Sequence, residues 1–268
     1  PEFIWILVLR ILITGSNGQL GQEFHRIKSL SKHKFLFTDK DQLNICSADS
    51  INSYMNKIEV DYIINCAAYT DVGKAEFEKE RAFDINSNGV KNLVNFCEKN
   101  NVKMIHFSTD YVYNSFSKKP INEDEFIDPQ NYYGFSKREG EKHIENSKNE
   151  SIVIRTSWLY SKYGNNFVNT IINKSKSGEN LKVINDQFGC PTYAKDLAEV
   201  VIQIIESDER IDKKGKIFNY SNKESTNWFD FAKKILLLYG SNNKIEAVDS
   251  DYFKDEVKRP RFSITSKQ

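Results

Sequence analysis

The chain has 268 residues, of which 28% are charged and 39% hydrophobic, and its formal net charge is +1. This length suits one large domain or one domain with an appended lobe. Basic and acidic residues are interspersed, so the sequence lacks the basic stripe of a nucleic-acid-binding protein. The apolar start, residues 1–9, is shorter than the roughly 20 residues that a bilayer crossing requires. We therefore expect neither nucleic acid nor membrane as a partner, and we set residues 1–9 aside as extra N-terminal sequence.

The first half of the chain alternates between short apolar runs and helical patterns. The predicted strands are 11–14, 35–39, 61–66, 103–108 and 151–160. The predicted helices are 20–30, 48–58, 75–100 and 132–145. Apolar strands that alternate with helices are typical of a parallel sheet covered on both faces. We expect an α/β fold with a Rossmann-type doubly wound parallel sheet over residues 10–163.

The pattern is looser after residue 164. Helices are predicted over 166–175, 196–207 and 227–239, and strands over 181–185 and 216–221. We expect residues 164–268 to form a smaller C-terminal, substrate-binding lobe that is interleaved with the sheet.

The cysteines and histidines give no sign of a metal site. The four cysteines are far apart and form no Cys-x-x-Cys pair (Cys46, Cys66, Cys97 and Cys190). Neither zinc nor a disulfide framework is indicated, and reduced thiols are typical of a cytoplasmic protein. His106 lies inside a predicted buried strand, where we expect a packed histidine and not a metal ligand.

Three glycines follow the first predicted strand in the pattern Gly-x-x-Gly-x-x-Gly (Gly15, Gly18 and Gly21). Glycines let the backbone approach a pyrophosphate, and the N-terminus of the next helix supplies N–H groups and positive charge. Strand, turn and helix in this order are the context of a dinucleotide-binding fingerprint. The alternative is an ordinary glycine-rich turn.

Tyr133 and Lys137 are spaced so that one helix face presents both side chains, one turn apart. A nearby ammonium lowers the pKa of a phenol, whose ordinary value is about 10. The pair would then work as a general acid or base near neutral pH. The alternative is an exposed helix on which a Tyr and a Lys stand four apart without function.

The predicted strand 103–108 ends in hydroxyl side chains, Ser108 and Thr109. Ligands of open α/β sheets bind beyond the carboxyl ends of the strands. We expect Thr109 to hydrogen-bond a substrate carbonyl, and we assign capping of the following turn to Ser108 and not to Thr109.

Asp39 ends the second predicted strand. A carboxylate at this place accepts hydrogen bonds from the 2′-hydroxyl of an adenosine ribose and repels a 2′-phosphate. Lys40, next to it, can pair with a phosphate. The sequence leaves the choice between NADH and NADPH open and leans toward NADH.

These segments together resemble the extended short-chain dehydrogenase/reductase superfamily and, within it, the dTDP-4-dehydrorhamnose reductases. The resemblance covers roughly residues 10–268. The matching motifs are Gly18-Gln-Leu-Gly21, Asn65-Cys-Ala-Ala-Tyr-Thr70, Phe107-Ser-Thr-Asp-Tyr-Val-Tyr113, Tyr133-Gly-x-x-Lys137, Arg155-Thr-Ser-Trp158, Asp186-Gln-Phe-Gly-x-Pro-Thr192 and Arg259-Pro-x-x-Ser263. One departure is Asn44, where the family often has Asp.

The resemblance implies NAD(P)H-dependent reduction of the C4 ketone of dTDP-4-dehydro-β-L-rhamnose, the last step of dTDP-rhamnose biosynthesis. Tyr133 would give the proton, Lys137 would hold the nicotinamide ribose, and Thr109 would align the ketone. The implied cofactor-binding residues are Gly15, Gly18, Gln19, Leu20, Gly21, Asp39, Asn44, Ile45, Ala68, Tyr69, Thr70, Tyr133 and Lys137. The implied substrate-binding residues are Thr109, Asp110, Trp158 and Gln187.

The resemblance also leaves alternatives. Glu23 matches an acidic position that some members use for Mg²⁺ between subunits, so a magnesium ion and a homodimer are both conceivable. The chain could instead be an epimerase or dehydratase for another nucleotide sugar, which keeps its NAD and regenerates it. It could also be a non-catalytic regulatory subunit on the same fold, although the presence of both Tyr133 and Lys137 argues against this alternative.

Overall fold

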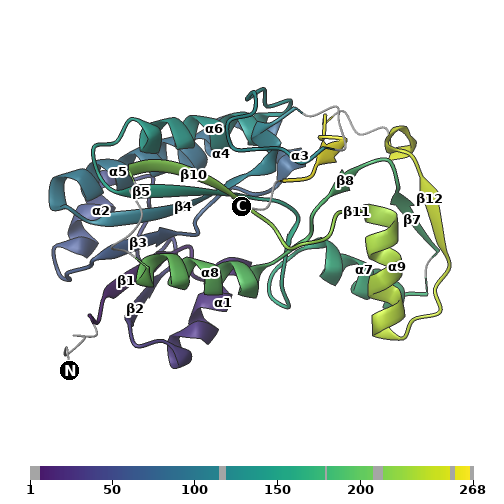
Figure 1. The fold of residues 1–268 in the computed structure, drawn as a ribbon, viewed down its shortest axis with the longest axis horizontal. Coiled ribbons are helices and arrows are strands. Elements are labelled where there is room, and N and C mark those ends of the chain that lie inside the picture. Colours follow the sequence, from purple (N-terminus) through teal and green to yellow (C-terminus); the bar gives the residue numbers. More distant parts are fainter. Residues whose placement is uncertain (1–6, 115–118, 179, 208–213, 254–256, 266–268) are drawn as a thin grey trace.

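The computed structural model describes residues 7–114, 119–178, 180–207, 214–253 and 257–265. Its centre is a six-stranded parallel sheet in the order β2-β1-β3-β4-β5-β10 (Figure 1). These strands are β1 (Arg10–Thr14), β2 (Lys34–Thr38), β3 (Tyr62–Asn65), β4 (Lys103–Thr109), β5 (Ser151–Thr156) and β10 (Lys214–Tyr220). The doubly wound parallel sheet expected from the sequence is thus confirmed. Strand order reverses between β1 and β3, and such a switch point is where open α/β sheets bind ligands.

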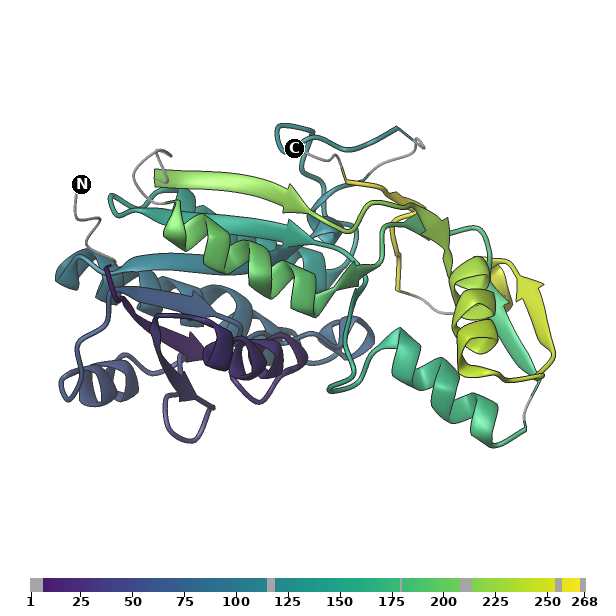
Figure 2. The same ribbon diagram turned by 60° about the horizontal axis from the view of Figure 1, so that its bottom comes forward.

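Helices cover both faces of the sheet, as Figure 2 shows. One core contains apolar residues of α1 (Gln19–Ile27) and α8 (Ala194–Glu206). The core on the other face contains residues of α2 (Ala48–Met55), α5 (Gly89–Asn100) and α6 (Tyr132–Glu145). Strands buried on both faces must be apolar throughout, which explains the continuous apolar runs of β1, β3 and β5.

The predicted helix 75–100 is wrong in one respect, because the structure divides it. It contains the end of α3 (Val72–Ala75), then α4 (Lys79–Phe83), a π-helical segment (Asp84–Asn88) and α5. Asn86, in the π-helical segment, turns inward and binds the backbone of Tyr69 through its amide, with its Nδ2 3.0 Å from the Tyr69 carbonyl. This long-range contact accompanies the local change in helix type, and π-helical turns are frequent at functional sites.

The predicted strand 151–160 is also interrupted. Strand β5 stops at Thr156 and the short β6 (Leu159–Tyr160) follows. Trp158 lies between them with a φ of 45°, in the left-handed region. A strand cannot pass through that conformation, so the chain turns away from the sheet.

A smaller lobe lies beside the sheet, at the right of Figure 1. It packs α7 (Phe167–Lys176) and α9 (Trp228–Tyr239) on the parallel pair β7 (Leu181–Ile184) and β12 (Ile245–Val248). Short strands connect the parts: β6 pairs with β9 (Thr192–Tyr193), and β8 (Phe188–Gly189) lies between β11 (Thr226–Asn227) and β13 (Phe262–Ser263).

The two parts alternate along the chain. After α7, β7 and β8 in the smaller lobe, the chain returns to the sheet for α8 and β10 and then leaves again for α9 and β12. Within the described ranges, none of the helices combines the length and the apolar character that a membrane crossing requires.

Candidate active site

The glycine-rich turn lies between the carboxyl ends of β1 and β3. Gly15 has a φ of +62°, and a Cβ there would come within 2.6 Å of the Ala67 backbone. A Cβ on Gly21 would come within 2.5 Å of Ser16 Cα. These glycines therefore let the turn after β1 pack against the segment after β3. They also let α1 begin in direct contact with the backbone of Ser16.

The N-terminus of α1 is suited to an anion. Gly18 is its N-cap residue and offers no side chain to the first N–H groups, and the first turn contains no acidic residue. Free N–H groups and the helix dipole attract phosphate. The residues present thus fit the pyrophosphate of a dinucleotide, with Gln19 and Leu20 in the first helical turn.

The remaining predicted cofactor residues surround the same end of the sheet. Asp39 follows β2; its Oδ1 accepts the backbone N–H groups of Asp41 and Gln42, and its Oδ2 accepts Asn17 Nδ2 at 3.1 Å. Asn44 is exposed, whereas Ile45 is buried in the core. Asp39 is therefore already a turn-forming residue, and a ribose hydroxyl would have to share its oxygens.

The segment after β3 is held in place from the helix side. Asn86 clamps Tyr69 by accepting its N–H at 2.9 Å and donating to its carbonyl, and it also donates to Ser136 Oγ. Ala68 and Thr70 flank this fixed point; Thr70 is exposed. A rigid, partly open strand-end loop next to the glycine turn can carry a bound dinucleotide.

Helix α6 brings Tyr133 to the end of β4. Asn131 caps the helix through Gly134 N–H at 2.8 Å. A Cβ on Gly134 would meet the Tyr111 carbonyl oxygen at 2.2 Å, so only glycine allows this approach of the helix to the β4 exit. The Tyr133 hydroxyl hydrogen-bonds the side chain of Thr109. Two residues predicted as catalytic, 24 positions apart, are thus in contact.

Thr109 has a second role that the sequence analysis assigned wrongly. Its Oγ1 accepts the backbone N–H of Tyr111 at 3.2 Å and so caps the 3₁₀ turn Asp110–Val112. Capping was expected from Ser108, but it is the Thr109 side chain that accepts the hydrogen bond from the turn. This cap fixes the Thr109 oxygen next to Tyr133.

The expected lowering of the Tyr133 pKa is wrong. Burial raises the pKa of Tyr133 to about 12, although the Thr109 hydrogen bond opposes this. The reason is that the Lys137 side chain is directed elsewhere: Nζ donates to the Phe107 carbonyl at 2.6 Å and lies 3.3 Å from His106 Nε2. Tyr133 is therefore protonated at neutral pH, as a proton donor must be.

Lys137 and Asp110 are both buried beside this tyrosine and both have displaced pKa values. Burial lowers the pKa of Lys137 to about 8, against the attraction of Glu141. Burial raises the pKa of Asp110 to about 7, against hydrogen bonds with Ser263 and Thr109. Displaced pKa values in one cluster are characteristic of catalytic sites.

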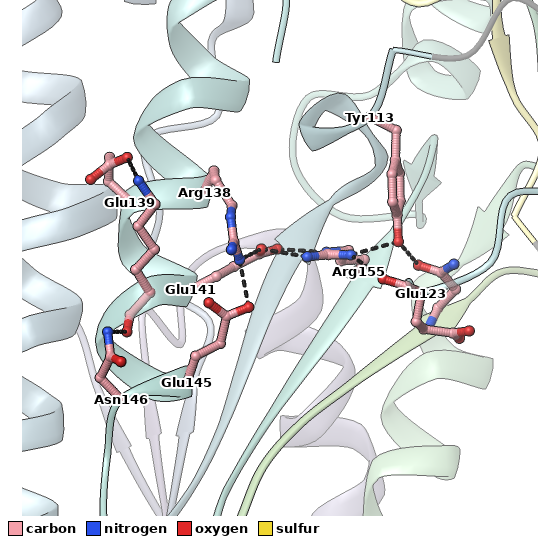
Figure 3. Close-up of polar contacts among 10 residues, drawn as sticks. Tyr113, Glu123, Arg138, Glu139, Glu141, Glu145, Asn146 and Arg155 are labelled. Carbon is pink, nitrogen blue, oxygen red and sulfur yellow. Dashed lines mark hydrogen bonds and ion pairs between the residues drawn. The ribbon is translucent and has the colours of Figure 1, made fainter. Parts of the chain in front are cut away.

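A buried ion pair anchors α6 to the sheet (Figure 3). Arg155, on β5, donates from Nε and Nη2 to the two oxygens of Glu141 at 2.8 and 2.7 Å. It also donates from Nη1 to the hydroxyl of Tyr113 at 2.6 Å. Arg138 donates to the same carboxylate from the solvent side. Because Glu141 stands one turn after Lys137, this network fixes the helix that carries the site.

A cavity of about 1000 Å³ lies between the smaller lobe and the segment that connects β4 to α6. Among its lining residues are Tyr111, Gln187 and Trp228. Gln187 donates to Ser250 Oγ at 3.0 Å and accepts from Trp228 Nε1 at 3.3 Å. The volume is that of a small-molecule pocket.

The comparisons with known proteins point the same way. The family model described as "RmlD substrate binding domain" matches residues 9–268. The chain belongs to this RmlD family. It is 37% identical to a dTDP-4-dehydrorhamnose reductase of Aggregatibacter actinomycetemcomitans, over 83% of this chain and 76% of that relative. It is 34% identical to the spore coat polysaccharide biosynthesis protein SpsK of Bacillus subtilis, over 96% and 89%.

A solved structure of an RmlD-type enzyme is similar over nearly the whole chain. The dTDP-4-dehydrorhamnose reductase of Bacillus anthracis in complex with NADP superposes with a TM-score of 0.92. It is 34% identical, and the match covers 98% of this chain and 92% of that one.

For this RmlD-family chain, the cavity lining contains Gln187 but not the other three predicted substrate residues, Thr109, Asp110 and Trp158. Trp158 stacks on Trp228, with ring centroids 3.4 Å apart. Its left-handed backbone costs of the order of 1–3 kcal/mol, a strain that is often found at functional sites. Direct contact of Trp158 with substrate stays a prediction.

Sequence reasoning missed the cations of the cavity. Its lining includes Lys174, Lys182, Lys258, Arg259 and Arg261, which come from three separate segments. Asn131 Nδ2 donates to the Lys258 carbonyl at 2.8 Å, which ties the last segment to the start of α6. The Arg-Pro motif at 259–260 was the available signal, but no spacing rule relates it to Tyr111, with which Arg259 hydrogen-bonds.

Proposed function

We propose that the protein reduces the C4 ketone of dTDP-4-dehydro-β-L-rhamnose to dTDP-L-rhamnose with NADH or NADPH. The observation that carries the proposal is the contact of Tyr133 with Thr109 at the end of β4, with Lys137 buried one helical turn away. Tyr111, whose ring contacts that of Tyr133, lines the cavity. Membership of the RmlD family and the reductases among its relatives support the sugar substrate. The bound nicotinamide supplies the hydride.

The chain's own residues supply the proton and its placement. Thr109 and Tyr133 present two hydroxyls to the ketone oxygen, and the developing alkoxide takes the proton of Tyr133. Hydrogen bonds that strengthen as charge grows on this oxygen accelerate the reaction. Lys137 would hold the nicotinamide ribose. The five cationic residues of the cavity lining would attract the diphosphate of the nucleotide sugar.

We make no choice between NADH and NADPH. Asp39 favoured NADH in the sequence analysis, but its oxygens already serve Asn17 and the turn. The similar Bacillus anthracis enzyme was solved with NADP. Exposed Lys40 is available to a 2′-phosphate. The ratio of kcat/KM for the two cofactors would measure the preference.

The expected Mg²⁺ is not part of the proposal. Both oxygens of buried Glu23 are without a hydrogen-bond partner, but Arg26 lies 3.7 Å away. Among the described residues, no group of three or more His, Cys, Asp or Glu side chains could hold a metal ion. The homodimer stays a prediction, which light scattering would test. A cytoplasmic location is proposed from the four free cysteines.

The test uses the purified protein with dTDP-4-dehydrorhamnose formed in situ. Loss of reduced-nicotinamide absorbance in a one-to-one ratio with dTDP-rhamnose formed would support the reductase. An epimerase or dehydratase would convert a nucleotide sugar without net consumption of the cofactor. A regulatory subunit would bind the dinucleotide and turn over no sugar.

A further inference from the structure

A chain of buried polar side chains runs below the proposed site from β1 to α6. Thr14 and Asn65 are register partners on β1 and β3, and Asn65 and His106 are register partners on β3 and β4. Thr14 Oγ1 donates to Asn65 Oδ1 at 2.7 Å, Asn65 Nδ2 lies 3.0 Å from His106 Nδ1, and His106 Nε2 lies 3.3 Å from Lys137 Nζ. Each of the four residues is at most 1% exposed.

The direction of these hydrogen bonds follows from one backbone group. Ala67 N–H donates to Asn65 Oδ1 at 3.2 Å, and Thr14 donates to the same oxygen. The amide oxygen of Asn65 is therefore on that side, and its NH₂ group must face His106. A donor can only face a lone pair, so His106 Nδ1 carries no proton.

This fixes the tautomer of His106. The imidazole is fully buried beside a lysine, and both conditions hold its pKa well below the ordinary value. A neutral imidazole without a proton on Nδ1 carries it on Nε2. The Nε2–H then points at Lys137 Nζ, which can accept it only as an uncharged amine.

We propose that His106 is a positioning residue of the reductase site, whose Nε2–H, oriented by Asn65, holds Lys137 and stabilises its amine form. The proposal rests on the proposed function only for its effect on catalysis. After Tyr133 has protonated the alkoxide, the phenolate must regain a proton. If Lys137 gives it, the lysine becomes an amine, and His106 provides the hydrogen bond that this amine needs.

The other titratable groups around Lys137 do not offer this contact. The residues that act electrostatically on Lys137 are Glu141 on its own helix, Cys66 after β3, and His106 on β4. Glu141 favours the ammonium and is itself committed to Arg155. Burial raises the pKa of the Cys66 thiol, which is therefore neutral. His106 is the member of this set that donates toward Nζ.

The first test needs neither cofactor nor substrate. The chain has four histidines, so ¹⁵N-detected imidazole spectra of labelled wild type and His106→Asn identify the His106 signals. We expect an Nε2–H tautomer that does not titrate between pH 5 and 9. An Nδ1–H tautomer, or protonation near the usual pKa, would overturn the proposal whatever the enzyme's activity.

The second test reverses the tautomer with a nearly isosteric change. In Asn65→Asp, one oxygen still accepts from Thr14 and Ala67, while the other accepts from a proton on Nδ1 of His106. The imidazole then turns a lone pair toward Lys137 and favours the ammonium. We expect the Lys137 titration, followed by its ¹³Cε shift, to move upward by about one pH unit, a tenfold change in its proton equilibrium.

The kinetic consequence separates positioning from folding. His106→Asn keeps an acceptor for Asn65 but cannot reach Lys137. We expect kcat to fall about 10- to 100-fold, as misplacement of a reacting group does, with the sugar KM within twofold. The limb of the pH profile assigned to Lys137 should move in the same direction as in Asn65→Asp.

His143→Asn is the matched control, because His143 lies on the same helix and contacts Ser87 Oγ at 3.2 Å. It should leave the pH profile unchanged. If His106→Asn lowers only the melting temperature and keeps the wild-type profile, His106 is a packing residue and the proposal fails.

Discussion

Replacing Arg155 by Met should destabilise the protein severely, because the change leaves the Glu141 carboxylate in the core without its main partner. The Glu141 side chain is fully buried, and Arg155 gives it two hydrogen bonds of 2.8 and 2.7 Å. Removal of one partner from a buried ion pair costs about 3–5 kcal/mol. Arg138 still contacts Glu141 at 2.9 Å, so we expect a value near the lower end of that range. At about 2–4 °C per kcal/mol for a chain of this size, the melting temperature should fall by roughly 6–12 °C.

A double variant and the pH dependence of stability provide two controls for the Arg155→Met prediction. The double variant Glu141→Met/Arg155→Met leaves no unpaired charge and should lose much less stability than Arg155→Met alone. Burial opposes ionisation of Glu141 in the native protein, but the hydrogen bonds and charge of Arg155 outweigh it and lower the pKa. This contribution is present above the unfolded-state pKa and is lost as the pH falls through the folded one. Because the unfolded-state value is about 4.5, calorimetry at pH 6 and pH 3 should show a smaller deficit at pH 3. A double variant as unstable as the single one would refute the unpaired-charge argument.

Three further predictions concern the site itself. Tyr133→Phe should lower kcat about 10²- to 10⁴-fold with the cofactor Kd within twofold, measured by stopped-flow and fluorescence titration; near-normal turnover would remove Tyr133 as the acid. Asp110→Asn should raise the melting temperature relative to wild type more at pH 8 than at pH 5. The folded-state pKa of this carboxyl is about 7, above its unfolded-state pKa. The wild-type protein therefore loses stability as the pH rises from the unfolded-state pKa through the folded-state pKa. An equal gain in melting temperature at both pH values would contradict this. Gly21→Ala should weaken cofactor binding at least about tenfold, because its Cβ would overlap the Ser16 backbone, whereas Gly73→Ala, with only an ordinary contact at 3.7 Å, should bind normally.

Elements determined by local pattern could be predicted from the sequence. Helix α6 begins and ends at the predicted residues because Asn131 caps it and its buried face repeats with helical spacing. The strands of the sheet were recognisable because both of their faces are buried. The glycine turn was recognisable because backbone approach at Gly15 and Gly21 excludes any other residue.

Features that depend on partners far away in the chain could not be predicted. The pKa of Tyr133 moves upward because Lys137 is held by His106 and Phe107, and no helical spacing rule reveals that contact. The division of the helix 75–100 accompanies the binding of the Tyr69 backbone by Asn86. The cavity cations likewise meet only after the smaller lobe has packed.

The edge strand β10 has a consequence for how the chain is made. It pairs with β5 but is synthesised after α7, β7 and α8. A nascent chain thus carries β5 with an unpaired edge while α7, β7 and α8 are being translated, and unpaired edges invite association with other strands. Because the polypeptide then crosses back for α9 and β12, no single cut separates the sheet and its helices from the smaller lobe. The enzyme's two lobes must therefore mature together, and a gene fragment encoding either one should not yield a working module.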